Sequence, residues 1–176
     1  MKFVLLCAVA ALGLASCSTI GLGGMGPNAA AMRDAPDYVR MAGSSDLFEI
    51  QSSQAALQTS QNAEVRRFAQ MMIDHHTMTT SEVTAAARSS GMTPPPPALA
   101  PHHAALLRQL QATAGAARER LYVQQQVTAH QKALALHTGY SRGGDTPALK
   151  AVAARAVTVV QQHLTDAQRL RGAAGR

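Results

Sequence analysis

Seven histidines are the side chains of this 176-residue sequence best suited to chemistry. Three of them, His76, His130 and His163, lie on the apolar stripes of three different long helical segments. Each stripe would turn one imidazole toward a shared interior. The remaining long segment offers Glu49, on a face of small residues that would leave room for a site.

A buried carboxylate that faces several imidazoles is costly unless a bound group satisfies them together. Neutral imidazoles and a carboxylate are a ligand set for zinc, iron, manganese or copper. We therefore predict a divalent metal site formed by Glu49, His76, His130 and His163, with zinc or iron favoured and copper a further candidate. The alternative is a metal-free polar core, in which each histidine bonds a neighbour and the cluster only fixes helix register.

Three residues beside the predicted ligands have open roles. His75 lies about 100° around the helix from its neighbour, so both cannot point inward. It is a surface residue, an extra ligand or a residue that orients a ligand. Asp46 and Asp166, each one turn from a predicted ligand, are surface acids, oxygen donors or groups that orient an imidazole.

Methionines and further histidines give weaker signals. Met71, Met72 and Met78 surround the histidine pair, and soft thioethers favour Cu(I), but methionine at helical spacing is more often core filler. We expect residues 102–103 to be an exposed helix start, and His137 to lie near the negative end of its helix.

The elements that position these residues are expected to be helices, because good helix formers dominate beyond residue 35 and no run alternates apolar and polar residues. Long helices are expected at residues 36–59, 62–90, 116–138 and 147–171, and a shorter one at 102–113. A loop is expected at 139–145. These lengths predict an all-α, ferritin-like four-helix bundle with an extra short helix between the second and third long helices.

The N-terminus has the charge and apolar run of a secretory signal, and the run is too short to span a membrane. It ends in Leu14-Ala15-Ser16-Cys17, which resembles the bacterial lipobox. The resemblance implies that residues 1–16 are removed and that Cys17 carries lipid such as palmitate; the alternative is an ordinary signal cut nearby. Residues 17–35 would then be the lipidated cysteine and a flexible tether, and 36–171 the domain. By the same resemblance, Ser18 after the cysteine favours attachment to the outer membrane, with the domain in the periplasm.

Composition excludes several functions. Both cysteines precede residue 18, so the predicted domain has no thiol for a disulfide or a thiolate metal site. The formal net charge of +6 is scattered, and only 3% of residues are aromatic, which argues against nucleic-acid binding. No serine-hydrolase elbow, phosphate-binding loop or dinucleotide fingerprint occurs, so metal chemistry is the enzymology left open.

Several segments resemble the bacterial domain-of-unknown-function family 4142, a ferritin-like helical family often labelled as outer membrane proteins. The resemblance rests on four stretches and covers about residues 36–171: Asp46-Leu47-Phe48-Glu49-Ile50, Glu64 through Thr77, Tyr122 through Leu134, and Gln161-Gln162-His163-Leu164. In the family pattern Glu49 matches a glutamate of the first helix. His76 matches the end of a Phe-Ala-x-x-Met-x-x-Asp-His motif, and His130 and His163 match two later histidines. His75 stands where the family usually has aspartate.

Three functions follow as hypotheses. The first is an envelope lipoprotein that holds a metal ion for structure, storage or stress sensing. The second is a periplasmic metalloenzyme that uses the same site to activate water or oxygen. The third is a structural or interaction lipoprotein with a metal-free polar core. The Glu-x-x-His pairs of di-iron bundles do not occur here, so oxygen chemistry by analogy has little support. The sequence leaves the protein partner and any catalytic residue unknown.

Overall fold

The computed structural model describes residues 30–174, and within them the chain forms five helices and no strand. The helices are α1 (Ala35–Thr59), α2 (Ala63–Ser89), α3 (Pro101–Ala112), α4 (Gly115–Gly143) and α5 (Pro147–Ala174). The predicted signal peptide at residues 1–16, the lipidation site Cys17 and most of the predicted tether lie outside the described residues.

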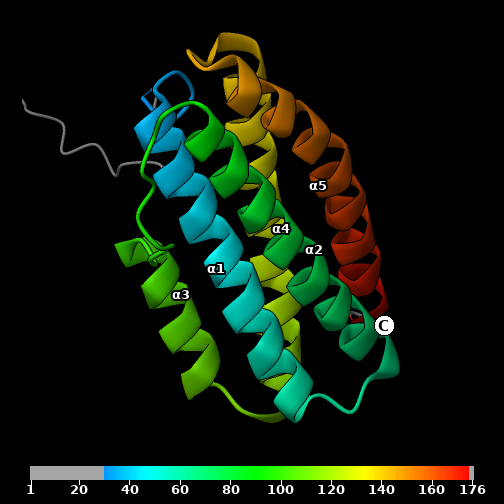
Figure 1. Ribbon diagram of the computed structural model, residues 1–176. Helices are drawn as coiled ribbons and strands as arrows, with labels where there is room; N and C mark the ends of the chain where they lie inside the picture. Colours follow the sequence, from blue (N-terminus) through cyan, green and yellow to red (C-terminus); the bar gives the residue numbers. More distant parts are fainter. Residues whose placement is uncertain (1–29, 175–176) are drawn as a thin grey trace, which may run out of the picture.

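The four long helices form a bundle in which α1 and α5 each pack against both α2 and α4 (Figure 1). In the view of Figure 1, α1 and α5 run downward and α2 and α4 run upward. Because α2 and α4 run in the same direction, the chain between them must cross back along the length of the bundle. The short helix α3 lies within this crossover and packs outside the bundle against α1 and α4. One long crossover is the connectivity of ferritin-like folds, so the predicted fold is confirmed.

Local sequence signals set the helix starts. The Asn62 side chain accepts from Glu64 N at 2.9 Å and caps α2, as its residue type predicts. Asp34 caps α1 in the same way, through a bond from Asp37 N at 3.2 Å. α3 has no side-chain cap of its own; instead Ala100 N donates to Ser44 Oγ of α1 at 2.7 Å, which ties the start of α3 to the bundle.

The core contains two large apolar clusters at opposite ends of the bundle and a small third cluster, in which α1, α3 and α4 meet through Phe48, Leu107 and Ala129. One large cluster contains Tyr38, Leu136, Tyr140 and Leu149 with their neighbours. The other is built around Phe68, Met72, Tyr122, Val127 and Leu164. The helix segments between the two large clusters carry three buried histidines, His76, His130 and His163, and two buried acids, Asp46 and Glu49. A polar layer therefore lies at mid-height of the bundle, closed from above and below by apolar packing. None of the helices among residues 30–174 is both long and apolar enough to cross a membrane.

The predicted loop at residues 139–145 is wrong for most of its length, because α4 continues to Gly143. Tyr140 is fully buried and stacks on Tyr38 with 3.9 Å between ring centroids, and this packing extends the helix past Gly139. A Cβ at Gly139 would lie 2.7 Å from Met32 Cγ. Gly139 is thus a point of close approach between segments rather than a helix stop.

The predicted flexible tether, residues 17–35, is also wrong at its C-terminal end. Ala31 is fully buried in the cluster of Tyr38 and Tyr140. Asp145 N donates to Arg33 O at 3.0 Å, and Ala35 N donates to Asp145 Oδ2 at 3.3 Å. The residues just before α1 are therefore held against the α4–α5 connection, because they complete the apolar cluster at that end.

The contacts of Asp145 generate the first prediction. Its side chain accepts from Tyr140 Oη at 2.8 Å as well as from Ala35 N, so it joins α1, α4 and the loop before α5. We expect Asp145→Ala to lower the free energy of unfolding by about 1.5–3 kcal/mol, the range for losing hydrogen bonds to a charged group. Chemical denaturation measures it.

The matched control is Asp37→Ala, which removes a solvent-exposed ion pair with Arg40 and should cost less than about 1 kcal/mol. Equal stabilities for the two variants would contradict the assignment of Asp145 as the group that holds this end together.

Candidate metal site

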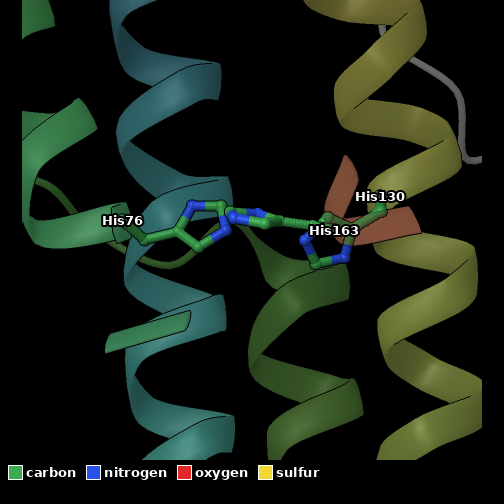
Figure 2. Close-up of side chains that lie close together, drawn as sticks. All are labelled: His76, His130 and His163. Carbon is green, nitrogen blue, oxygen red and sulfur yellow. The ribbon is translucent and has the colours of Figure 1, made fainter. Parts of the chain in front are cut away.

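Three imidazoles from three helices meet at the polar layer: His76 of α2, His130 of α4 and His163 of α5 (Figure 2). Each offers one ring nitrogen, and the three atoms lie within 4.8 Å of one another. All three side chains are at most 3% exposed. The structure therefore brings together three of the four residues that the sequence singled out.

The inward nitrogens have no hydrogen-bond partner within the described chain: His76 Nε2, His130 Nε2 and His163 Nδ1. The second nitrogen of each ring is bonded from outside. His76 Nδ1 lies 2.8 Å from Asp46 Oδ1, His130 Nδ1 lies 2.8 Å from Gln126 O, and His163 Nε2 lies 2.8 Å from His75 Nδ1.

These outer contacts decide which nitrogen of each ring carries the proton. A carboxylate and a backbone carbonyl can only accept, so His76 and His130 donate through Nδ1, and each leaves the lone pair of Nε2 facing inward. When His75 accepts through Nδ1, the Nε2 proton of His163 points outward and its Nδ1 lone pair joins the other two. Three lone pairs then converge on one buried point, which is the arrangement a metal ion requires.

Asp46 is itself held in place, because Thr80 Oγ1 donates to its second oxygen at 3.0 Å. Asp46 is only 2% exposed, and α1 and α2 enclose the acid and its two partners. A fixed carboxylate behind an imidazole orients the ring and raises its basicity as a ligand. The one-turn spacing from Glu49 was the sequence signal for this residue.

Glu49, the fourth predicted ligand, lies next to the histidine cluster but outside it. Its Oε1 is 3.9 Å from His130 Nδ1, and both carboxylate oxygens lack a hydrogen-bond partner within the described residues. It is 1% exposed. A buried, unbonded carboxylate at this distance can serve as a further oxygen donor after a side-chain rotation, or as a proton acceptor beside the cluster.

Burial sets the charge state of the site. Burial, and then the charge of His76, lower the pKa of His130 to about 3. Burial and the neighbouring histidines lower the pKa of His163 to about 2. Both rings are neutral near pH 7, the form that binds metals.

His76 and Glu49 behave differently. Burial alone would lower the pKa of His76, but the hydrogen bond and charge of Asp46, with the charge of Glu49, outweigh it and raise that pKa. Burial raises the pKa of Glu49 to about 7, although the charge of His76 opposes the shift.

The spacing of the inward nitrogens suits a small ion after a modest contraction. Tetrahedral zinc with bonds of about 2.0–2.1 Å places its ligand nitrogens about 3.4 Å apart. The ring nitrogens here lie within 4.8 Å of one another, so the rings would have to approach one another to reach that spacing.

The structure places the other residues that the sequence singled out in different surroundings. His75 contacts His163 from outside the cluster, which fits the last of its three possible roles, that of a residue that orients a ligand. Asp166 contacts Gln162 and Arg169 instead of an imidazole. Met72 is fully buried in an apolar cluster.

Two histidines outside the site are buried, contrary to expectation. His103 is 5% exposed, lies 2.7 Å from Ser44 Oγ and stacks on Phe48, so residues 102–103 are not simply an exposed helix start. His137 lies within α4 and contacts Tyr38 Oη at 3.0 Å. Since α4 ends at Gly143 and not at the predicted residue 138, His137 lies further from the helix end than expected.

One group that orients a histidine of the site could not be predicted from the sequence. The carbonyl of Gln126 orients His130, and any residue type at that position supplies a carbonyl. Its side chain is also fully buried, with Nε2 donating to Ser52 Oγ at 3.1 Å.

Fold and site together define a ferritin-like helical bundle with a buried cluster of histidines. The model of the family described as "Domain of unknown function (DUF4142)" matches residues 23–170, so the chain belongs to this family. A comparison with curated proteins gives no match.

Two solved structures share the fold. A DUF305 fragment from Deinococcus radiodurans is 18% identical, with a TM-score of 0.69, over 78% of this chain and 95% of that one. CopM in its Cu(II)-bound form is 14% identical, with a TM-score of 0.66, over the same shares of 78% and 95%.

The buried histidines predict a pH-dependent stability. Burial lowers the pKa values of His103, His130, His137 and His163 to between about 2 and about 4. The unfolded chain protonates histidine below about pH 6.5, so between these limits it binds more protons than the folded protein. The stability that these histidines contribute is therefore fully present above about pH 6.5, and it is lost as the pH falls toward their pKa values in the folded protein.

We expect the metal-free protein to lose on the order of 1 kcal/mol per such histidine between about pH 7 and about pH 5. His76, with its raised pKa, works in the opposite direction but is outnumbered. Thermal unfolding across this range measures the change, and His137→Gln should reduce the slope. An unfolding temperature that stays constant from pH 7 to pH 5 would contradict the prediction.

Proposed function

We propose that this protein is a metal-binding module of the cell envelope, with His76, His130 and His163 as nitrogen ligands and Glu49 as an additional oxygen donor. One observation carries the proposal: three imidazoles from three helices direct unpartnered nitrogens at one buried point, while their other nitrogens are bonded from outside. The module would hold the ion for storage, structure or metal sensing.

A metal-free polar core is the weaker alternative. Each buried polar atom without a partner costs about 1–3 kcal/mol, and a core that served only helix register would pair its members with one another. Here the three inward nitrogens and both oxygens of Glu49 have no such pairing. A bound cation would satisfy the three inward nitrogens at once, and Glu49 as well after its side chain rotates toward them.

The set of donor atoms limits which ion the site would bind. Three imidazoles suit zinc and copper, whereas non-haem iron sites commonly combine two histidines with a carboxylate. The clustering of three nitrogens, with the carboxylate further away, therefore moves the expectation from iron toward Zn²⁺ or Cu²⁺. The copper in the CopM structure is a further reason to test Cu²⁺.

Metal titration of the purified full chain, without a histidine tag, tests the proposal. We expect the protein to bind about one equivalent of Zn²⁺ or Cu²⁺ at the three buried histidines and to unfold at a higher temperature when the ion is bound. His130→Gln should lose that binding. Calorimetry and elemental analysis measure it. Absence of stoichiometric binding by Zn²⁺, Cu²⁺ and Fe²⁺, with melting unchanged on chelation, would overturn the proposal.

Two further variants sharpen the test. Asp46→Ala removes the acceptor behind His76 and should weaken binding about 10- to 100-fold, as loss of a group that orients a ligand does. His102→Gln, a partly exposed histidine outside the cluster, is the matched control and should bind as the wild type does. Equal weakening by both changes would point to a general loss of stability.

A catalytic version of the same site is the second candidate. It is favoured by the three-nitrogen group, which leaves a coordination position open, and by Glu49, whose buried carboxylate lies beside that group with a raised pKa. In that case Glu49 would accept or donate a proton at the open position. Glu49→Gln should then abolish turnover while metal binding persists, whereas in a simple binding module it would change affinity alone.

We also propose that Cys17 attaches the protein to the membrane, with the domain in the periplasm. The support is the Leu14-Ala15-Ser16-Cys17 motif after a short apolar run. Two or more acyl chains at one cysteine are sufficient for stable attachment.

Labelling of bacterial cells with radioactive palmitate should mark the wild-type chain, which should fractionate with the outer membrane. Cys17→Ser should lose the label and the membrane association. Cys7→Ser is the control, because this cysteine lies in the segment expected to be removed. A palmitate label that survives Cys17→Ser would refute attachment at this residue.

A further inference from the structure

A stripe of two methionines and a histidine runs along α2 next to the candidate metal site. Met71, His75 and Met78 are spaced four and three residues apart, so their side chains follow one another on one helix face. Met71 and His75 are partly buried, and Met78 is 52% exposed. Among residues 30–174, Met78 is the large hydrophobic side chain left exposed.

A single exposed methionine is unremarkable by itself, since folded proteins leave scattered apolar side chains in water. Its position relative to His75 is what gives it chemical meaning. Thioether sulfur is a soft ligand, and together with imidazole it selects Cu(I) over the hard ions magnesium and calcium. Methionine side chains are long and flexible, so two of them can close around an ion held by the histidine between them.

His75 connects this stripe with the inner cluster. Its Nδ1 lies 2.8 Å from His163 Nε2, and the two rings are stacked with centroids 5.0 Å apart. Because Nδ1 is engaged in this contact, Nε2 is the ring atom left for a ligand at the surface, and it has a free lone pair when His75 carries its proton on Nδ1 and donates it to His163 Nε2. The inner histidines need the opposite tautomer, in which His163 donates through Nε2 and its Nδ1 faces the other two rings, so the two sites use alternate tautomers of this histidine pair.

We propose that Met71, His75 and Met78 form an outer binding site for Cu(I) on α2. The stripe supplies two thioethers and one imidazole, and its histidine touches a ligand of the inner cluster. The outer site would collect the ion at the surface, next to the buried site. The outer site stands on its own residues; only its link to the inner cluster rests on the proposed function.

The test is Cu(I) binding by the full chain with Cys7→Ser and Cys17→Ser in every sample, so that methionine is the remaining source of sulfur. Competition with a colorimetric Cu(I) chelator under anaerobic conditions gives the stoichiometry. X-ray absorption at the copper edge reports whether sulfur is bound. We expect copper–sulfur scattering in this parent protein and its loss in Met71→Leu/Met78→Leu, with about one equivalent of Cu(I) fewer.

The matched control is Met41→Leu/Met92→Leu, which changes two partly buried methionines packed against the other end of the bundle. It should keep the copper–sulfur signal. Scattering from nitrogen and oxygen alone in the parent, or a sulfur signal that survives Met71→Leu/Met78→Leu, would overturn the outer site.

Zn²⁺ binding by the same proteins separates this proposal from the proposed function. Zn²⁺ should bind the inner histidines in Met71→Leu/Met78→Leu as in the parent, because zinc does not require the thioethers. Intact Zn²⁺ binding without a copper–sulfur signal would reject the outer site alone. A copper–sulfur signal in a protein whose inner histidines bind neither Zn²⁺ nor Cu²⁺ would support the outer site and reject the proposed function.

Discussion

A neutral imidazole has one proton for two nitrogens, and the site depends on where three such protons are placed. Asp46, the Gln126 carbonyl and His75 each approach one ring from outside. Every outer contact that takes a proton leaves a lone pair pointing inward. Without these contacts the rings could bond one another and close the centre. The orientation of a few outer acceptors thus separates a candidate metal site from an ordinary buried polar network.

The bundle makes this arrangement affordable by confining it to one layer. Apolar clusters at both ends of the bundle hold the helices together, and the polar residues occupy the short stretch between them. The low-dielectric surroundings strengthen each hydrogen bond that is made and keep His130 and His163 neutral. The same surroundings make an unsatisfied acceptor costly, which is the physical reason to expect a ligand there.

The small residues of α1 have more than one task. On the sequence they leave room for a site beside Glu49. In the structure Ser44 binds the start of α3 and His103, and Ser53 Oγ lies 2.8 Å from Tyr122 Oη. Their small size brings neighbouring elements close, while their hydroxyls satisfy polar groups that the close approach would otherwise bury. The fold shared with structural neighbours of 14–18% identity therefore says little about chemistry; the individual side chains decide it.

The sequence alone determined the helices, the bundle and the residues of the polar layer. Helical periodicity places His76, His130 and His163 on apolar stripes, and a stripe must face a core. The sequence could not determine how far each helix is rotated or shifted against its neighbours. Only the tertiary structure showed that Glu49 stands apart from the three nitrogens, that His75 reaches His163, and that Tyr140 carries α4 past Gly139. Those outcomes depend on contacts between residues far apart in the chain, and shifts of a few ångströms between packed helices decide them.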